Sequence, residues 1–351
     1  MGMKRRALLA TGTAIAAAAI HQVWSAEPGV AQANKVVNLY SARHYDADNK
    51  VYQAFFKKTG IKVNLVEAPA DKLIERLKSE GANSPADVLI TVDAGNLWRT
   101  QQAGLFQKVP TSSSLYSRIP ANLRDPDGFW FGFTKRARVI IYNKTKVKPG
   151  EIARYEDLAD PKWRGKILMR SSSNVYNQSL VGSLIAALGA AKTEAWAKGL
   201  VANFARPPEG NDVSQIKSLA AGMGSLSVVN TYYLGRLAKS SKAEDRQAVE
   251  KVGIIFPNQK DRGTHVNISG GGIAKHSPNR KAAQLYLEYL ASPEAQKIFA
   301  GNNYEYPVVP GVAIDPVLVS FGKFKEDKLN PKVFGGWNRA AIQLMDRAGW
   351  K

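Results

Sequence analysis

The chain has 351 residues and carries 49 Lys or Arg against 29 Asp or Glu, which gives a net charge of +20. This length exceeds what one small core needs and is enough for two compact lobes. The sequence contains no cysteine, which excludes a disulfide framework, a thiolate metal site, a cysteine nucleophile and a lipoprotein anchor.

Residues 1–33 have the pattern of an export signal. Basic residues at 4–6 precede an uncharged, alanine-rich stretch at 7–20, and "VAQA" supplies a small-residue cleavage pattern that ends at Ala33. The arginine pair followed by leucines is similar to a twin-arginine signal, and an ordinary secretory signal remains the alternative. The apolar stretch is shorter than the roughly 20 residues of a spanning helix. We therefore expect a free protein of the periplasm.

The charge of the remaining chain is spread along its whole length. Residues 1–33 carry three basic residues and one acidic residue, so 46 basic and 28 acidic residues remain, with a net charge of +18. Such a balance suits nucleic acid, an anionic membrane surface or an acidic ligand. Because no dense basic block is present, no nucleic acid partner is expected for an exported protein.

Short apolar stretches alternate with helical patterns after residue 34, as is typical of α/β layers around parallel strands. The first expected strands and helices alternate at 35–41, 46–60, 61–68, 71–81, 86–93 and 94–104. The alternation is then interrupted by a β-rich stretch at 128–144, which is long enough to cross from one lobe to another near Thr134.

The alternation resumes beyond this crossing. The expected elements are at 165–172, 174–190, 213–222, 224–230 and 231–240. A second β-rich stretch at 251–275 is expected to return to the first lobe. Helices at 277–292 and 292–302 each begin with serine as N-cap and proline as the first helical residue.

The sequence therefore predicts a two-lobed α/β fold joined by crossing strands. Lobe 1 is expected to contain residues 34–134 and 263–316, and lobe 2 residues 135–262 and 317–351. In open α/β sheets, ligands bind where strands end and the next helices begin.

Tyrosines follow three of the expected strands at such junctions. Tyr45 and its neighbour His44 lie in "NLYSARHYDADN", Tyr176 follows a serine-rich loop, and Tyr232 and Tyr233 follow "SLSVVN". If the three junctions face a common cleft, four phenols and one imidazole converge. Taken singly, each tyrosine is a packing residue by default and His44 a hydrogen-bonded loop residue.

Phenolate oxygen is a hard, anionic ligand that suits a hard and highly charged cation. Ionising a phenol of pKa about 10 at pH 7 costs roughly 4 kcal/mol, so only a strongly Lewis-acidic ion repays the cost for four of them. Ferric iron is the obvious candidate. Ferric iron with four phenolates has a net charge of −1, and Arg236, on the helix face of Tyr232 and Tyr233, is expected to be the buried arginine that neutralises it. Arg43 is a second candidate for supporting the ligands.

These motifs resemble the periplasmic ferric-iron-binding proteins of iron ABC importers, in particular the cyanobacterial FutA group. The resemblance covers nearly all of the chain after the signal and is carried by "LYSARHYDAD", "ADVLITVDAGNLWRTQQAGLFQ", "GFTKRARVIIYNK", "DPKWRGKI", "SSSNVYNQSL", "VVNTYYLGRL" and "NNYEYPVVPGV".

The resemblance implies a type II periplasmic binding protein fold with the ligand in the cleft between the lobes. It implies that Tyr45 and His44 of lobe 1 and Tyr176, Tyr232 and Tyr233 of lobe 2 hold iron, without a glutamate ligand or bound anion. The implied cargo is Fe3+, with Fe2+ left open, and the implied partner is an inner-membrane ABC permease. No catalysis is implied, and a monomer is expected.

Three alternatives remain. An anion-binding protein of the same fold, for phosphate or a phosphonate, would use serines such as those at 171–173. An enzyme lacks support, because G-x-S-x-G, H-E-x-x-H and P-loop motifs are absent, although a carboxylate pair needs no fixed spacing. The glycines of "SGGGIAK" are better explained as a bend after a strand. A surface-binding role rests on charge alone.

Overall fold

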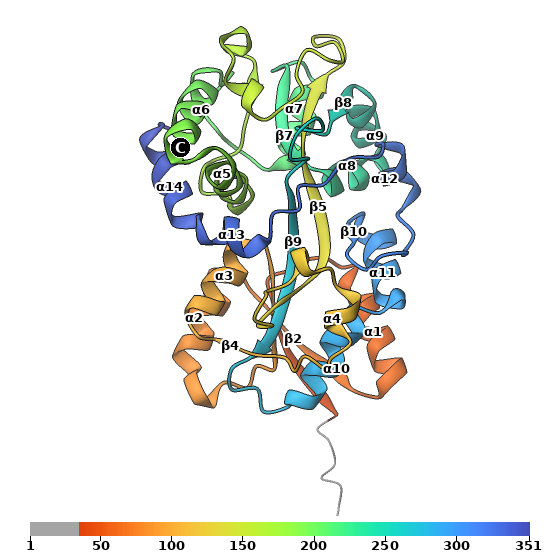
Figure 1. Cartoon of the computed structure of the whole chain (residues 1–351). Coiled ribbons are helices and arrows are strands. Elements are labelled where there is room, and N and C mark those ends of the chain that lie inside the picture. Colours follow the sequence, from red (N-terminus) through yellow and green to blue (C-terminus); the bar gives the residue numbers. More distant parts are fainter. Residues whose placement is uncertain (1–34) are drawn as a thin grey trace, which may run out of the picture. The chain divides into compact units, whose positions relative to one another are not determined.

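The structure, a computed structural model, describes residues 35–351, and the export signal expected at 1–33 lies outside them. Within the described residues, no helix is long and apolar enough to cross a membrane. Figure 1 shows helices packed around strands at two levels, with strands β5 (Phe131–Asn143) and β9 (Val266–Ala274) running between them.

The lower level in Figure 1, here called the first half, has the strand order β2-β1-β3-β9. Strand β1 pairs in parallel with β2 and β3, and β3 pairs antiparallel with β9. Besides β9, the strands of this half are β1 (Val36–Ser41), β2 (Lys62–Glu67), β3 (Val88–Val92), β4 (Phe106–Gln107) and β10 (Tyr306–Pro307). Its α-helices are α1 (Asp48–Thr59), α2 (Ala70–Glu80), α3 (Ala94–Gln102), α4 (Leu115–Arg118), α10 (Arg280–Leu290) and α11 (Pro293–Asn303).

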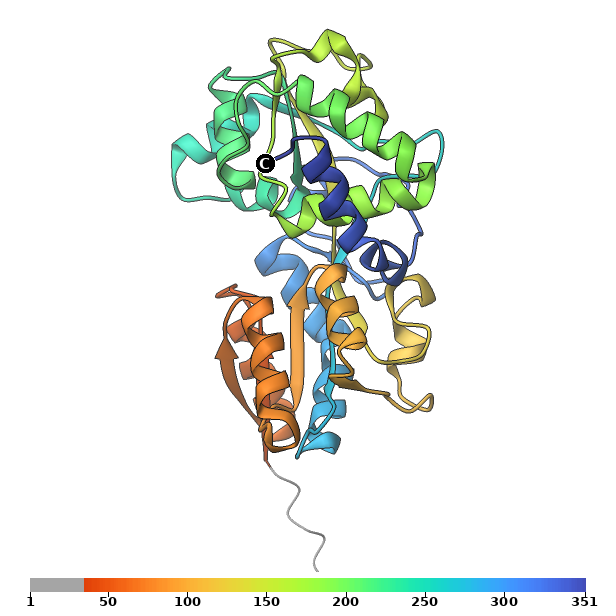
Figure 2. The same ribbon diagram turned by 90° about the vertical axis from the view of Figure 1, so that its left-hand side faces the viewer.

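The upper level, here called the second half, is built on β5, β7 and β6 with β8 beside β5. Its strands besides β5 are β6 (Ile167–Leu168), β7 (Leu226–Asn230) and β8 (Val252–Ile255). Its α-helices are α5 (Val175–Leu188), α6 (Ala190–Ala202), α7 (Asp212–Ala220), α8 (Thr231–Ala238), α9 (Ala243–Glu250), α12 (Pro316–Ser320), α13 (Pro331–Gly336) and α14 (Asn338–Arg347). The turned view of Figure 2 shows α5, α6 and α14 grouped on one side of this half.

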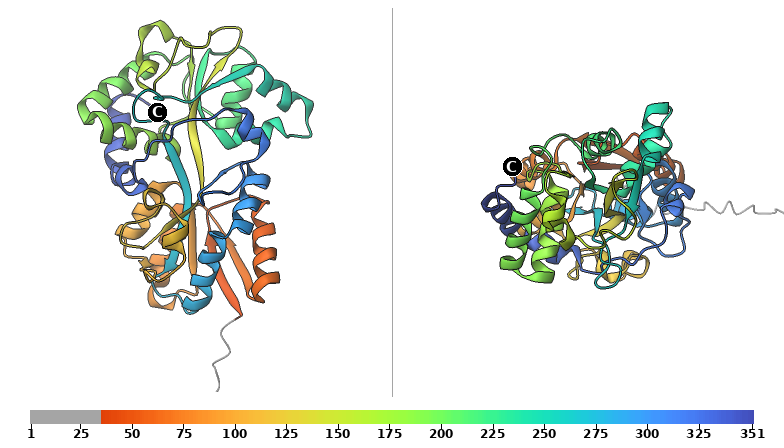
Figure 3. Two further views of the ribbon diagram at one scale, coloured as in Figure 1. Left: turned by 45° about the vertical axis from the view of Figure 1, so that its right-hand side comes forward. Right: turned by 90° about the horizontal axis from the view of Figure 1, so that it is seen from above.

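Strand β5 belongs to both halves. Its first residues pair antiparallel with β9, from Phe131 to Ala137, and its later residues pair antiparallel with β7 and β8, from Arg138 to Asn143. The register with β9 shifts between Gly132 and Thr134, which marks a bulge close to the expected crossing point. Figure 3 shows β5 as a continuous ribbon between the two halves.

The hydrophobic cores follow the same division. One core is built from residues 37–133 and 268–308, whereas two others are built from residues between 137 and 252 together with residues of 306–350. Each half therefore buries its own apolar surface, which is the organisation of two lobes.

Three expectations from the sequence need correction: the direction of the strands, the start of one helix and the conformation of the glycine-rich segment. The sheet is mixed rather than parallel throughout, because the crossing strands run antiparallel to their neighbours. The helix expected from residue 277 begins at Arg280, because Asp87 accepts hydrogen bonds from the Ser277 hydroxyl and the Asn279 backbone and holds this turn outside the helix. Ser292, by contrast, caps α11 as expected.

The glycines of "SGGGIAK" form no bend, because they lie inside β9. A Cβ at Gly270 would lie 2.5 Å from the carbonyl oxygen of Phe131, and one at Gly271 would lie 2.4 Å from that of Leu89. The lack of side chains lets β9 pack closely against its neighbours.

Candidate metal centre

The structure places the three tyrosine junctions at helix starts or in the loop before a helix. Tyr45 lies between β1 and α1, Tyr176 is the second residue of α5, and Tyr232 and Tyr233 are in the first turn of α8, directly after β7. The side chain of Asn174 caps α5 by accepting a hydrogen bond from the backbone N–H of Tyr176. The local sequence thus determines the position of each tyrosine relative to the start of its helix.

The phenols meet around Tyr232, whose side chain is fully buried. The hydroxyl of Tyr45 donates to that of Tyr232 over 3.4 Å, and the hydroxyls of Tyr176 and Tyr232 are also 3.4 Å apart. The rings of Tyr232 and Tyr233 lie 4.1 Å apart between centroids. Phenol oxygens from both halves therefore lie close enough to share one ion.

Burial favours the protonated form of three of these phenols, Tyr45, Tyr232 and Tyr233. The pKa values of Tyr45 and Tyr232 are raised well above the ordinary value, first by desolvation and then by the neighbouring phenols. Desolvation and Tyr176 likewise raise the pKa of Tyr233. A cation that binds these three phenols must displace their protons to gain anionic ligands.

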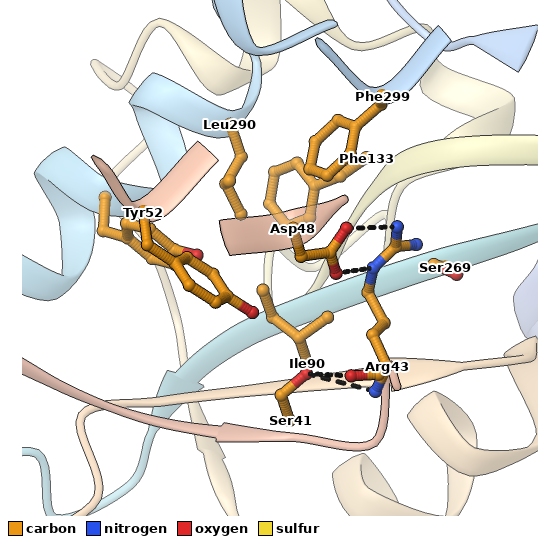
Figure 4. A pocket seen from close by; sticks show the side chains of 10 residues that line it. Ser41, Arg43, Asp48, Tyr52, Ile90, Phe133, Ser269, Leu290 and Phe299 are labelled. Atoms are coloured by element: carbon orange, nitrogen blue, oxygen red, sulfur yellow. Dashed lines mark hydrogen bonds and ion pairs between the residues drawn. The ribbon is translucent and has the colours of Figure 1, made fainter. Parts of the chain in front are cut away.

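A buried group of charges underlies Tyr45. The guanidinium of Arg43 bonds to the carboxylate of Asp48 at 2.7 Å and to that of Glu305 at 3.0 Å. Figure 4 shows the pair of contacts between Arg43 and Asp48, beside a small cavity. Thr134 donates to Oε1 of Glu305 at 2.8 Å, and a guanidinium nitrogen of Arg136 lies 3.5 Å from the same oxygen. Glu305 thus holds two arginines beneath the phenols.

A second group of charges lies beside Tyr176. Arg138 and Arg170 share the carboxylate of Asp212, at 3.0 and 2.9 Å. In this group two arginines pair with one carboxylate, so one positive charge is in excess. The guanidinium carbons of both lie within 6 Å of the Tyr176 ring, at 5.8 and 5.9 Å, which is cation–π distance.

Arg136 is a further buried arginine next to the phenol cluster. It is 1% exposed, its guanidinium carbon lies 5.5 Å from the Tyr176 ring centroid, and it donates to Ser269 at 2.7 Å. Its Nε and Nη2 atoms have no hydrogen-bond partner among the described residues. Such donors are costly to bury unless an anion faces them, and phenolates would supply that anion.

The other predicted residues take different places. Arg43 is buried, with its guanidinium carbon 4.8 Å from the Tyr45 ring centroid. His44 is exposed, and no hydrogen bond joins it to the phenols within residues 35–351. Arg236 lies 6.0 Å from the Tyr45 ring but is also exposed, which corrects the expectation of a buried counterion there.

Sequence reasoning missed Arg136, Arg138 and Glu305. A signal for the two arginines was present, because residues two apart in a strand share a face, and these two interrupt the apolar stretch of β5. Nothing local distinguished Glu305, which is brought to the site by the chain after α11.

The serines of the anion-binding alternative bond mainly to one another. The hydroxyls of Ser171 and Ser173 are 2.9 Å apart, and Ser171 also accepts from the backbone of Ser173. Among the described residues, no group of three or more His, Asp or Glu side chains could hold a metal. Tyrosine therefore provides the converging oxygen donors of this site.

Comparison with known proteins gives matches along the whole chain. Residues 83–339 match the family described as bacterial extracellular solute-binding protein. Iron uptake protein A1 of Synechocystis is 51% identical, with 99% of each chain covered. The Fe(3+)-binding periplasmic protein of Serratia marcescens is 28% identical, over 91% of this chain and 92% of its own.

A solved structure agrees with these relatives. The Trichodesmium protein IdiA (FutA), in complex with iron and citrate ligands, is 62% identical and superposes with a TM-score of 0.87, over 90% of this chain and 100% of its own. The α/β architecture, with its mixed sheet, is that of a two-lobed type II binding protein.

Proposed function

The chain belongs to the bacterial extracellular solute-binding protein family, and we propose that it captures ferric iron in the periplasm and delivers it to an inner-membrane ABC permease. One observation carries the proposal: the hydroxyls of Tyr45 and Tyr176, which come from opposite halves, both lie 3.4 Å from that of Tyr232. Relatives named for iron uptake and for Fe(3+) binding support the same cargo.

The chemistry of the donors favours ferric iron. Ionising a phenol of pKa about 10 at neutral pH costs roughly 4 kcal/mol, and desolvation raises the pKa of Tyr45, Tyr232 and Tyr233 further. A hard, triply charged ion repays this cost, whereas a softer or less charged ion does not. Ferrous iron, which carries one charge less, is the weaker candidate.

The surrounding charges favour an anionic complex. Ferric iron with four phenolates has a net charge of −1, and the pairing of Arg138 and Arg170 with Asp212 leaves one positive charge beside it. The unpartnered donors of Arg136 would face the phenolate oxygens. In this proposal Arg136 takes the buried role that the sequence assigned to Arg236.

We propose that the two halves are lobes that close on the ion. Lobe 1, residues 34–134 and 263–316, contributes Tyr45, and lobe 2, residues 135–262 and 317–351, contributes Tyr176, Tyr232 and Tyr233. Ligands divided in this way favour the closed state only while a metal bridges them. His44, exposed at the same junction, is an additional ligand in this proposal.

The remaining roles follow from this assignment. The protein acts as a monomer, catalyses no reaction, binds no nucleic acid and has the permease as its protein partner. The family to which it belongs consists of solute-binding proteins. An anion-binding protein of the same fold is the competing function, with the serines at 171–173 as its site.

Titration with ferric citrate followed by visible spectroscopy tests the proposal. Phenolate bound to ferric iron is coloured, so the wild type should develop a charge-transfer band. The double variant Tyr232→Phe with Tyr233→Phe should lose the band and tight binding while its circular dichroism is unchanged. Tyr116→Phe is the matched control, because its hydroxyl bonds to the backbone of Val109 within the first half. Unchanged iron affinity in the double variant would exclude these phenols, and a colourless wild type that binds phosphate would favour the anion-binding function.

A further inference from the structure

Asp93 occupies an unusual backbone position between strand β3 and helix α3. Its φ angle is 81° with ψ at 136°, a region that only glycine adopts readily, and its side chain is fully buried. A non-glycine residue persists in such a conformation when the surrounding contacts hold it there. The contacts of the Asp93 side chain therefore indicate the role of this residue.

The carboxylate of Asp93 accepts hydrogen bonds from three directions. The backbone N–H of Gly95 donates to Oδ1 at 2.7 Å, which caps α3, and Asn267 of β9 donates to Oδ2 at 2.7 Å. The hydroxyl of Ser179 reaches both carboxylate oxygens, at 2.8 and 2.9 Å. The first two contacts are within the first half, but the third comes from helix α5 of the second half.

Helix α5 links this contact to the metal centre. Ser179 follows Tyr176 by three residues on the same helix, so the two side chains share a face. The core around α5 belongs to the second half, where Leu180 and Val181 are buried, whereas β3 is buried in the core of the first half. The bond from Ser179 to Asp93 therefore joins the two halves one helical turn from Tyr176.

The surrounding packing between the halves is tight. Helix α13 contacts both α3 and α5. A Cβ at Gly335 would lie 2.9 Å from the carbonyl oxygen of Ala94, and one at Gly182 would lie 2.5 Å from that of Phe334. Glycine at these positions permits the close approach that brings Ser179 within reach of Asp93.

We propose that Asp93 is a positioning residue that binds Ser179 when the lobes are closed and thereby holds Tyr176 over the cleft. The role rests on the proposed function, because it assumes that closure around an ion is what the protein does. A hydrogen bond to a carboxylate is worth more than one between neutral groups, so the contact favours the closed state over a state in which water solvates both side chains. Asp93 contacts no metal in this role and acts through helix α5.

The alternative is that Asp93 only caps α3 and supports the turn. Ser179→Ala separates the two roles, because it removes the contact between the halves and leaves the bonds from Gly95 and Asn267 in place. Asp93→Asn is the second variant, since asparagine tolerates positive φ better than most residues. Ser183→Ala is the matched control: Ser183 is buried one turn further along α5, and its hydroxyl donates to the backbone carbonyl of Leu180 within the same helix.

The experiment measures two quantities on the full mature chain. The first is the rate at which the iron-loaded protein loses its visible band to a strong chelator, and the second is the radius of gyration of the metal-free protein from small-angle X-ray scattering. In Ser179→Ala and Asp93→Asn we expect iron loss roughly tenfold faster than in the wild type, from the weight of one hydrogen bond to a charged group. The metal-free form should shift toward the more extended state. Ser183→Ala should match the wild type in both.

The outcomes separate this inference from the proposed function. If Ser179→Ala keeps the wild-type rate of iron loss and the wild-type scattering, the contact does not position the lobes, although iron binding stands. If Ser183→Ala is as impaired as Ser179→Ala, the effect belongs to damage within α5 and the inference fails. A wild type without a ferric band would defeat the proposed function, and the inference would fail with it. Should Asp93→Asn not fold, Ser179→Ala still decides.

Discussion

The phenol oxygens of Tyr45 and Tyr232 lie 3.4 Å apart although 187 residues separate them in the chain. Their rings meet edge to face, with centroids 6.1 Å apart. The pair brings together the loop after β1 and the first turn of α8. Tyr45 is the phenol that the first half contributes to this contact. Variants of Tyr45 therefore test whether the first half contributes to iron binding.

Tyr45→Phe should weaken ferric iron binding by at least tenfold and change the wavelength of the visible band, because one phenolate ligand is lost while the ring still packs. Competition with a chelator of known affinity measures the loss. His44→Ala should have a smaller effect, since the imidazole is exposed. A larger loss in His44→Ala than in Tyr45→Phe would make the histidine the principal ligand of the first half.

Acid should release the iron before it unfolds the protein. Burial raises the pKa values of the metal-free Tyr45 and Tyr232 phenols, so protons compete with the ion for these oxygens and occupy them increasingly as the pH falls. The visible band should disappear on lowering the pH in a buffer that does not bind iron, while far-ultraviolet circular dichroism stays constant. Loss of both signals at the same pH would show that unfolding, not protonation, releases the ion.

Base should destabilise the metal-free protein. Folding raises the pKa of Tyr232 above the value of about 10 that it has when unfolded, so its stabilising contribution is complete below about pH 10 and declines as the pH rises further. Urea denaturation midpoints should fall as the pH is raised above about 10. The decline should be shallower in Tyr232→Phe, which has no ionisable group at this position, and an equal decline in both proteins would assign the effect to other residues.

Glu305→Gln should be strongly destabilising even without iron. The carboxylate is fully buried and pairs with Arg43 and Arg136, which together hold its pKa below the usual range against desolvation. Removing one partner from a buried charge pair costs about 3–5 kcal/mol. Chemical denaturation of the metal-free protein measures this loss. Glu294→Gln, at an exposed pair with Lys58, is the control and should leave the midpoint unchanged.

Gly182→Ala should destabilise the protein although alanine favours helices. The new Cβ would lie 2.5 Å from the backbone oxygen of Phe334, so α5 or α13 must shift, at a cost of about 1–3 kcal/mol. Gly301→Ala in α11 is the contrasting variant, because an added Cβ would meet no atom of another described segment within 4 Å, and it should stabilise by up to about 1 kcal/mol. Thermal unfolding of both variants gives the comparison. If both variants changed the unfolding temperature equally, α5 and α13 could move apart at little cost in free energy.

Local sequence patterns predicted those features of the fold that depend on neighbouring residues. Tyr45, Tyr176 and Tyr232 each lie between the end of a strand and the first turn of the next helix, and helix starts such as that of Ser292 have side-chain caps, so neighbouring residues were sufficient. Strand direction was not predictable in this way. Whether β9 runs parallel or antiparallel to β3 depends on how the chain returns from the second half.

The buried charges were harder to predict for a similar reason. Arg136 and Glu305 are 169 positions apart, and each alone has the appearance of a surface residue. Their burial follows from mutual pairing, at 3.5 Å, together with Arg43. The exposed position of Arg236 was not predictable either. The periodicity of α8 indicates which residues share a helix face but not which part of that face reaches solvent.

Strand β5 leaves one sheet and enters the other without a break. Any separation of the two halves therefore requires twist or bending of this strand, whose register with β9 is interrupted between Gly132 and Thr134. A fragment that retained only one half would also leave the other without its central strand. Complementation between separately expressed halves is thus a poor way to divide this chain, whereas exposed surface loops are better sites for inserting a reporter domain.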